Sequence, residues 1–203
     1  MTKLLADQAL DRFIELMLQR PVGQRRVIDV GSGPGDHARI MRAKGLDVLT
    51  VDTNPQHKPD VVGEIRNVPY SMWKDVDGIW CSHVLEHAAD VSYFLSMTKV
   101  FLAIGGILAI TVPPRKDAIV GGHLSLWNAG LLVYNLVRNR YDCSNARIKT
   151  YGYNCSVIVE NAPAKYNIDD LVHDNGDIET LKPWLPDFFH HGVNGMIEEW
   201  NWK

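Results

Sequence analysis

The residues best suited to chemistry lie in a glycine-rich turn, "VIDVGSGPGDHARI", at positions 27–40. Gly31, Gly33 and Gly35 alternate along it, whereas a dinucleotide-binding turn needs its third glycine where this chain has Asp36. A triphosphate-binding loop would continue into Gly-Lys-Ser/Thr, which does not follow here, and Pro34 offers no N–H to a phosphate oxygen. The spacing therefore disfavours both phosphate-bearing ligands.

Two acids beside this turn narrow the choice of ligand. Asp29 precedes Gly31 in an apolar run, where it would repel a pyrophosphate but attract the ammonium and sulfonium groups of S-adenosylmethionine. Asp52 ends the next apolar run, where an acid can accept hydrogen bonds from ribose hydroxyls. The combination predicts S-adenosylmethionine as the cofactor. The alternatives are that the glycines only pack a strand against a helix and that Asp29 only braces the loop.

Two histidines are candidates for a catalytic base. His123 ends the segment "PPRKDAIVGGH", in which Gly121 and Gly122 would let the chain approach a ligand closely. Ligands of parallel α/β sheets bind beyond the carboxyl ends of the strands, so His123 is predicted to face the acceptor and to take the proton of an acceptor hydroxyl. The alternative is that it caps or orients the next helix. His83, after another expected strand, is the rival base.

The segment "SHVLEH", positions 82–87, contains residue types that bind metals, but we expect no metal there. Glu86 and His87 are adjacent and would diverge on a helix, and no second cluster in the sequence completes a ligand set. Glu86 is expected instead to cap the following helix, and His87 to pack.

Apolar periodicity predicts the elements that would position these residues. The chain opens with an amphipathic helix, and later helices are expected over 36–45, about 89–102 and 126–139. Strands are expected at "RVIDV", "LDVLTVD", "PDVVGEI", "GIWCSHV" and "ILAITV". This alternation predicts an α/β fold with a Rossmann-like, doubly wound, mostly parallel sheet. The last two strand-like runs, "ARIKTYGYN" and "SVIVEN", are predicted to pair antiparallel.

We expect a single domain from the 203 residues. Its parts would be an N-terminal helix over 1–22, a cofactor-binding core over 23–162 and a C-terminal tail over 163–203. The tail is rich in tryptophan and phenylalanine, so it is expected to pack on the core and to cover part of the acceptor pocket.

Composition excludes some classes of function. The formal net charge of -3 gives no overall field that attracts polyanions, so a nucleic-acid partner is not expected. The three cysteines form no CxxC pair, and the sequence shows neither a leader segment nor an apolar run long enough for a membrane. A cytoplasmic protein without a membrane partner is the resulting prediction.

The segments "VIDVGSGPG" and "SHVLEH" resemble the class I S-adenosylmethionine-dependent methyltransferase family, in its small-molecule group, over about Val27 to Val112. The resemblance implies a seven-stranded sheet with an antiparallel last strand. It also implies positions for the cofactor: Gly31, Ser32 and Gly33 at the methionine part, Asp52 and Thr53 at the ribose, Glu64 and Ile65 at the adenine, and Ser82 and His83 at the sulfonium.

The predicted function is methyl transfer from S-adenosylmethionine to a small or medium acceptor, with a sugar or glycan precursor as one candidate. Such a reaction depends chiefly on holding two reactants in line, and a base is needed only when the acceptor loses a proton. The alternatives are a non-catalytic cofactor-binding module and a methyltransferase that acts on nucleic acid or protein. The oligomeric state is not predicted.

Overall fold

The computed structural model describes residues 4–174, 176–189 and 195–203 of the chain. Its helices are α1 (Asp7–Leu18), α2 (Asp36–Ala43), α3 (Tyr70–Trp73), α4 (Val91–Phe101), α5 (Ala129–Arg138) and α6 (Asp177–Leu181). Its strands are β1 (Arg26–Val30), β2 (Asp47–Asp52), β3 (Val61–Val62), β4 (Val76–Ser82), β5 (Leu102–Val112), β6 (Arg147–Tyr151), β7 (Asn154–Glu160) and β8 (Glu199–Trp200). None of the helices among these residues is long and apolar enough to cross a membrane.

The strands form one sheet in the order β3-β2-β1-β4-β5-β7-β6-β8. The five strands from β3 to β5 are parallel, and β7 runs antiparallel to both β5 and β6. The Rossmann-like α/β fold and the antiparallel pairing of β6 with β7 are therefore confirmed. The predicted count of seven strands is wrong by one, because the short β8 pairs with the outer edge of β6.

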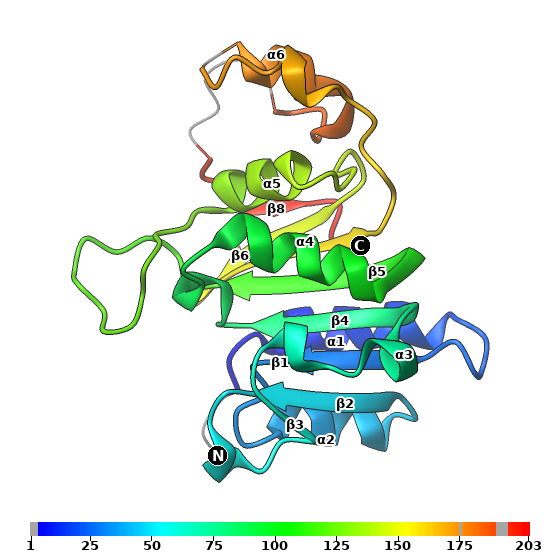
Figure 1. The fold of residues 1–203 in the computed structure, drawn as a ribbon. Helices are drawn as coiled ribbons and strands as arrows, with labels where there is room; N and C mark the ends of the chain where they lie inside the picture. Colours follow the sequence, from blue (N-terminus) through cyan, green and yellow to red (C-terminus); the bar gives the residue numbers. More distant parts are fainter. Residues whose placement is uncertain (1–3, 175, 190–194) are drawn as a thin grey trace.

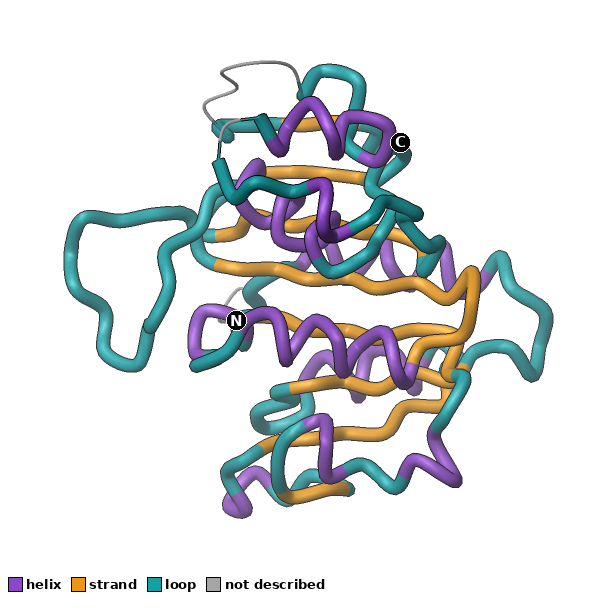
Figure 2. The backbone as a smooth tube through the Cα atoms, turned by 45° about the horizontal axis from the view of Figure 1, so that its top comes forward, coloured by secondary structure: helices purple, strands orange, loops and turns teal. Residues whose placement is uncertain are grey.

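Helices cover both faces of the sheet (Figures 1 and 2). On one face, α1 buries residues such as Phe13 and Met17 together with Met41 of α2 and Trp80 of β4. The other face carries the larger core, to which α4 and α5 contribute. Strands buried on both faces consist of continuous apolar residues, so the parallel strands could be predicted from the sequence.

Two helices next to the site begin at side-chain caps. The Asp90 carboxylate accepts a hydrogen bond from the backbone N–H of Tyr93 at the start of α4, and Asn128 caps α5 at Leu131 in the same way. The expectation that Glu86 caps α4 is wrong. Glu86 lies in an earlier 3-10 turn, Leu85–His87, and the extended backbone after it puts Asp90 at the cap position.

The tail packs against the α5 side of the sheet. Leu171, Leu181, Leu185, Phe189 and Ile197 join the larger core, and Phe188 packs edge-to-face on Trp200 of β8 with ring centroids 4.7 Å apart.

The carboxyl ends of the parallel strands meet at one edge of the sheet, and the segment between β5 and α5 projects from this edge (Figure 1). A bridge between Pro114 and Trp127 closes the base of this segment, and the N–H of Arg115 donates to the Trp127 carbonyl at 2.6 Å. We call residues 113–127 the β5–α5 loop. It adds to the edge where ligands bind in such sheets.

Candidate active site

A pocket of about 600 Å³ opens at the carboxyl ends of β1, β2 and β4. Six of the predicted cofactor residues line it: Gly31, Asp52, Thr53, Glu64, Ile65 and His83. The other four, Asp29, Ser32, Gly33 and Ser82, are not part of its wall. We call it the cofactor pocket.

The glycine turn approaches the end of β4 very closely. Gly31 has φ +69, and a Cβ added to it would lie 2.1 Å from Cγ2 of Val84. The backbone N–H groups of Gly31 and Ser32 both donate to the carbonyl of Val51, at 2.7 and 3.1 Å. Only glycine fits this approach, so the turn presents bare backbone to the pocket.

Asp52 organises the turn from the end of β2. Its Oδ2 accepts the N–H of Gly33 at 2.7 Å, and its Oδ1 accepts the N–H of Asn54 at 2.8 Å. His57 Nδ1 lies 3.2 Å from the same Oδ1. These contacts hold the carboxylate in one position at the pocket wall. A group that accepts hydrogen bonds from a ligand needs to be fixed in this way.

Asp29 is buried behind the turn, and its Oδ2 has no hydrogen-bond partner among the residues that the structure describes. Burial raises its pKa to about 7, the charge of Asp52 adds to the rise, and Arg42 opposes it. Ser32 Oγ is likewise buried without a partner within the described chain. An unpaired carboxylate oxygen and hydroxyl beside a bare glycine turn fit the ammonium end of S-adenosylmethionine.

The opposite end of the cofactor pocket is more open. Ile65 is buried and gives an apolar surface, whereas the side chain of Glu64 is half exposed and pairs with Arg66 at 3.1 Å. An apolar wall with an adjacent acid suits a flat, hydrogen-bonding ring.

His83 stands where the cofactor pocket meets the end of β4. Its backbone lies in the left-handed region, φ +56, which is unusual for a non-glycine residue and typical of functional sites. Its Nδ1 lies 3.4 Å from Glu86 Oε1, and its Nε2 lies 3.0 Å from Asn154 Oδ1. Burial lowers the pKa of His83, but the contacts with Glu86 and Asn154 outweigh it and the pKa rises.

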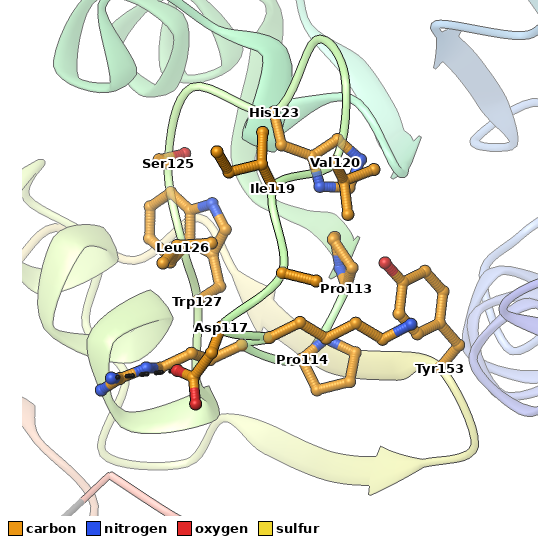
Figure 3. Close-up of a pocket in the computed structure, with 13 residues that line it drawn as sticks. Pro113, Pro114, Asp117, Ile119, Val120, His123, Ser125, Leu126, Trp127 and Tyr153 are labelled. Carbon is orange, nitrogen blue, oxygen red and sulfur yellow. Dashed lines mark hydrogen bonds and ion pairs between the residues drawn. The ribbon is translucent and has the colours of Figure 1, made fainter.

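A second, smaller pocket of about 210 Å³ lies in the β5–α5 loop (Figure 3). His123 lines it, as do Trp127 and Tyr153, the latter from the turn between β6 and β7. Ser125 Oγ and Trp127 Nε1 are buried and lack hydrogen-bond partners in the described part of the chain. Lys116 Nζ lies 4.1 Å from the centre of the Tyr153 ring. We call this the loop pocket.

Two ring contacts join the pockets. His83 stacks on Tyr153 with centroids 5.9 Å apart, and His87 meets His123 edge-on at 5.0 Å. In each pair one residue lines the cofactor pocket and the other the loop pocket. A molecule in the loop pocket would therefore lie next to one in the cofactor pocket.

The structure also departs from several expectations for this region. His87 does not pack inside the fold: its half-exposed ring contacts His123 and the Gly122 carbonyl. The sequence showed no second cluster that could complete a ligand set with Glu86 and His87, yet the loop places His123 beside them. No residue of the tail, as far as it is described, lines either of these two pockets, and the expected cover over the acceptor stays a prediction.

Sequence reasoning did not single out Tyr153, Ser125 or Trp127. The sequence did carry a signal for Tyr153. In the hairpin, β6 runs parallel to β5 and β7 returns antiparallel to both. The turn between β6 and β7, which contains Tyr153, must therefore lie at the carboxyl edge of the sheet. Ser125 and Trp127 sit in a loop whose path no local pattern reveals.

Comparison with known proteins agrees with this geometry. A family model described as a methyltransferase domain matches residues 4–148. No protein with a curated description matches the chain in sequence.

Solved structures with a similar fold include a SAM-dependent methyltransferase from Archaeoglobus fulgidus, with TM-score 0.60, 16% identity, and 76% of this chain and 94% of that chain covered. A 1,6-didemethyltoxoflavin-N1-methyltransferase from Burkholderia thailandensis, solved with bound S-adenosylhomocysteine, has TM-score 0.58, 17% identity, and coverage of 76% and 79%. The sugar N-methyltransferase KedS8 from Streptoalloteichus has TM-score 0.57, 13% identity, and coverage of 76% and 87%.

The family match spans most of the chain, and the glycine turn, the fixed Asp52 carboxylate and the unpaired Asp29 suit the cofactor that this family uses. The chain therefore belongs to the methyltransferase domain family and is an S-adenosylmethionine-dependent methyltransferase.

Proposed function

We propose that the protein methylates a hydroxyl group of a small polar acceptor of the sugar type, and that this acceptor binds in the loop pocket. The observation that carries the proposal is the junction of the two pockets, where His83 meets Tyr153 and His87 meets His123. Methyl transfer requires the acceptor atom to be held next to the methyl carbon, and adjoining pockets provide that proximity.

The lining of the loop pocket supports an acceptor that is rich in oxygen atoms. Buried polar groups normally find partners, so the unpaired Ser125 Oγ and Trp127 Nε1 need hydrogen-bonding groups from a ligand. The Trp127 ring, Pro113 and Pro114 add apolar surface. Hydrogen-bonding groups on an apolar wall suit a sugar ring, which carries hydroxyls at its edge and C–H groups on its faces.

The size of the loop pocket favours a small acceptor over a polymer. Its volume of about 210 Å³ is below the usual range for drug-sized ligands, roughly 300–1,000 Å³. This agrees with the net charge of -3, which gives no general attraction for nucleic acid.

Within this proposal, the bound cofactor supplies an activated methyl group, and the chain binds it in the cofactor pocket. Asp29 and Ser32 would receive the ammonium end behind the glycine turn. Asp52 and Thr53 would face the ribose, and Ile65 would lie against the adenine. As the sequence predicted, Gly31 and Gly33 would lie at the methionine part and Glu64 at the adenine. Ser82 would lie with His83 at the sulfonium.

His123 is the proposed group that activates the acceptor hydroxyl. It lines the loop pocket, and its ring nitrogens form no hydrogen bond with any described residue. His83 is less suited to this role, because its two nitrogens face Glu86 and Asn154. A base of this kind contributes about 10²–10⁴-fold to turnover.

The test is methylation of a panel of sugars and nucleotide-linked sugars with labelled S-adenosylmethionine, followed by identification of the product. Ser125→Ala and Trp127→Phe each remove one donor and should raise the acceptor KM roughly 5–100-fold, the range for a lost hydrogen bond of about 1–3 kcal/mol. S-adenosylhomocysteine affinity should stay unchanged. Ser71→Ala, an exposed serine on α3 outside both pockets, is the matched control.

Two results would overturn the proposal. One is binding of S-adenosylhomocysteine without methylation of any small acceptor, which would favour a non-catalytic module. The other is unchanged acceptor kinetics in both Ser125→Ala and Trp127→Phe, which would place the acceptor elsewhere.

A further inference from the structure

We infer that Glu86, His87 and His123 form a binding site for a divalent transition-metal ion at the junction of the two pockets. The metal-binding part of this inference stands on the geometry of the cluster. Its catalytic part rests on the proposed function, because the ion would bind and activate the acceptor hydroxyl. It replaces the sequence-based expectation that no metal binds here.

The three residues offer one carboxylate oxygen and two imidazole nitrogens within 4.8 Å of one another. Ligand atoms in a tetrahedral site lie about 3.4 Å apart when each is about 2.1 Å from the ion. The most widely separated ligand atoms therefore need to approach by up to about 1.4 Å, which a loop residue such as His123 can do. Two histidines and one carboxylate are a ligand set that first-row divalent ions favour.

His87 is already held as a metal ligand would be. Its Nδ1 lies 2.7 Å from the carbonyl oxygen of Gly122, and a carbonyl can only accept, so Nδ1 carries the proton. Nε2 then has the free lone pair, and it faces Glu86 Oε1 at 3.9 Å. Histidines that bind metals typically donate their second N–H to a carbonyl or carboxylate in this way.

The environment of Glu86 is a second, independent indication that an ion binds here. Its side chain is 1% exposed, and neither carboxylate oxygen accepts a hydrogen bond from the part of the chain that is described. The ring nitrogens that face Oε1 are Nδ1 of His83 and Nε2 of His87, at 3.4 and 3.9 Å. A buried carboxylate without hydrogen bonds is costly, and a metal ion would remove this cost.

The β5–α5 loop contacts Glu86 and His87 directly. The N–H groups of Leu124 and Ser125 donate to the Glu86 carbonyl, at 2.7 and 3.4 Å. Gly122 has φ +80, and a Cβ there would lie 3.1 Å from His87 Nδ1. Glycine thus lets the loop come close enough to place His123 over His87, so the cluster does not arise from a chance approach of two exposed side chains.

Three protein ligands leave the ion with open coordination positions, as in catalytic metal sites. His87 lines the cofactor pocket and His123 the loop pocket, so these positions lie where the two meet. An acceptor hydroxyl bound to the ion becomes more acidic. Its O–H bond would break and the proton would pass to water. The oxygen would use the freed electron pair to bond the methyl carbon, while the carbon–sulfur bond of the cofactor breaks and the sulfur keeps that bond's electrons. His123 then activates the acceptor through the ion instead of as a base.

The test is titration of the full chain, stripped with a chelator, with Co²⁺ by visible absorption and with Zn²⁺ by calorimetry. The wild type should bind one ion tightly. His123→Asn and His87→Gln should each weaken binding by about 100-fold or more, since even outer partners of metal ligands cost 10–100-fold. Glu86→Gln should do the same. His173→Asn, at an exposed histidine that lines neither pocket, is the matched control.

Thermal unfolding of each variant without metal distinguishes loss of metal binding from loss of the fold. His123→Asn should destabilise the fold least, because His123 lies partly exposed in a loop. Equal Co²⁺ affinity in the wild type and in folded His123→Asn would overturn the inference. Methylation that survives complete chelation would overturn its catalytic part and leave the proposed function intact. Metal binding at the cluster without methylation of any small acceptor would overturn the proposed function and leave the metal site.

Discussion

The two halves of the proposed active site are built differently. The cofactor half consists of residues at or just beyond strand ends, such as Gly31 after β1 and Asp52 at the end of β2, whose positions the parallel register fixes. The acceptor half consists of the β5–α5 loop, closed at its base by the Pro114–Trp127 bridge and tied at its tip to Glu86 and His87. Substitutions in the cofactor half should therefore change the stability of the fold and the affinity for the cofactor. Substitutions in the acceptor half should change the kinetics with the acceptor.

Gly31→Ala should have the largest effect. The new Cβ would meet Val84 in a backbone conformation that L-residues avoid, so the free energy of unfolding should fall by about 2–5 kcal/mol. Thermal unfolding and S-adenosylhomocysteine binding measure it. Gly33→Ala is the control: it has a similar positive φ but open space around its Cβ, so it should cost only about 1–2 kcal/mol. Equal losses in the two variants would mean that the approach to Val84 is not tight.

Asp52→Ala should weaken S-adenosylhomocysteine binding by about 1.5–3 kcal/mol, the range for a hydrogen bond to a charged group. The change removes a proposed ribose contact and also the bonds that hold Gly33 and Asn54. Calorimetry measures the affinity, and Asp47→Ala, at the exposed start of the same strand, is the control. An affinity like that of the wild type would exclude Asp52 from the cofactor site.

The pKa of about 7 at Asp29 predicts that cofactor affinity depends on pH. If the ammonium group binds ionised Asp29, affinity for S-adenosylhomocysteine should rise roughly tenfold between about pH 6 and about pH 8. Binding isotherms at several pH values measure this rise, and Asp29→Asn should abolish it. A wild-type profile that Asp29→Asn does not change would rule out this contact.

The same pKa predicts an opposite trend in stability. Asp29 binds its proton more tightly in the fold than in the unfolded chain, where its pKa is near 3.8. Its contribution to the free energy of unfolding is therefore full at low pH and is lost as pH rises to about 7. Denaturant unfolding of ligand-free Asp29→Asn should show a smaller loss over that interval than the wild type.

Lys116→Ala should have the smallest effect, and only in the acceptor half. Its contact with the Tyr153 ring is of a kind worth about 0.5–1 kcal/mol at exposed sites, so the acceptor KM should rise about 2–5-fold while cofactor affinity stays constant. Lys116→Arg keeps a cation over the ring and should behave like the wild type. A larger effect on the cofactor than on the acceptor would break the division into two halves.

Local patterns in the sequence were sufficient for the cofactor half. Short segments of the sequence contain the glycine turn and the apolar runs of β1, β2 and β4. Strands that are buried on both faces consist of continuous apolar residues, so they can be predicted from such runs. The start of the fifth strand was predicted too late. The expected strand "ILAITV" begins at Ile107, yet β5 already begins at Leu102, because its pairing with β4 extends to this end.

Other features depended on partners that are remote in the sequence. Strand β8 is only two residues long and exists because the edge of β6 is free to pair. Glu86 was expected at a helix cap, but the 3-10 turn and the backbone that follows give that position to Asp90. In both cases tertiary pairing or loop geometry overrode a local preference.

The sequence by itself determined the fold class, the cofactor and six of the residues that line the cofactor pocket, because these follow from strand periodicity and from residues adjacent to strand ends. Only the tertiary structure decided that His123 meets His87 and Glu86 and that Tyr153 stacks on His83. These contacts join segments far apart in the chain, and the position of a loop depends on the hydrogen bonds at its tip and base, which no local pattern encodes.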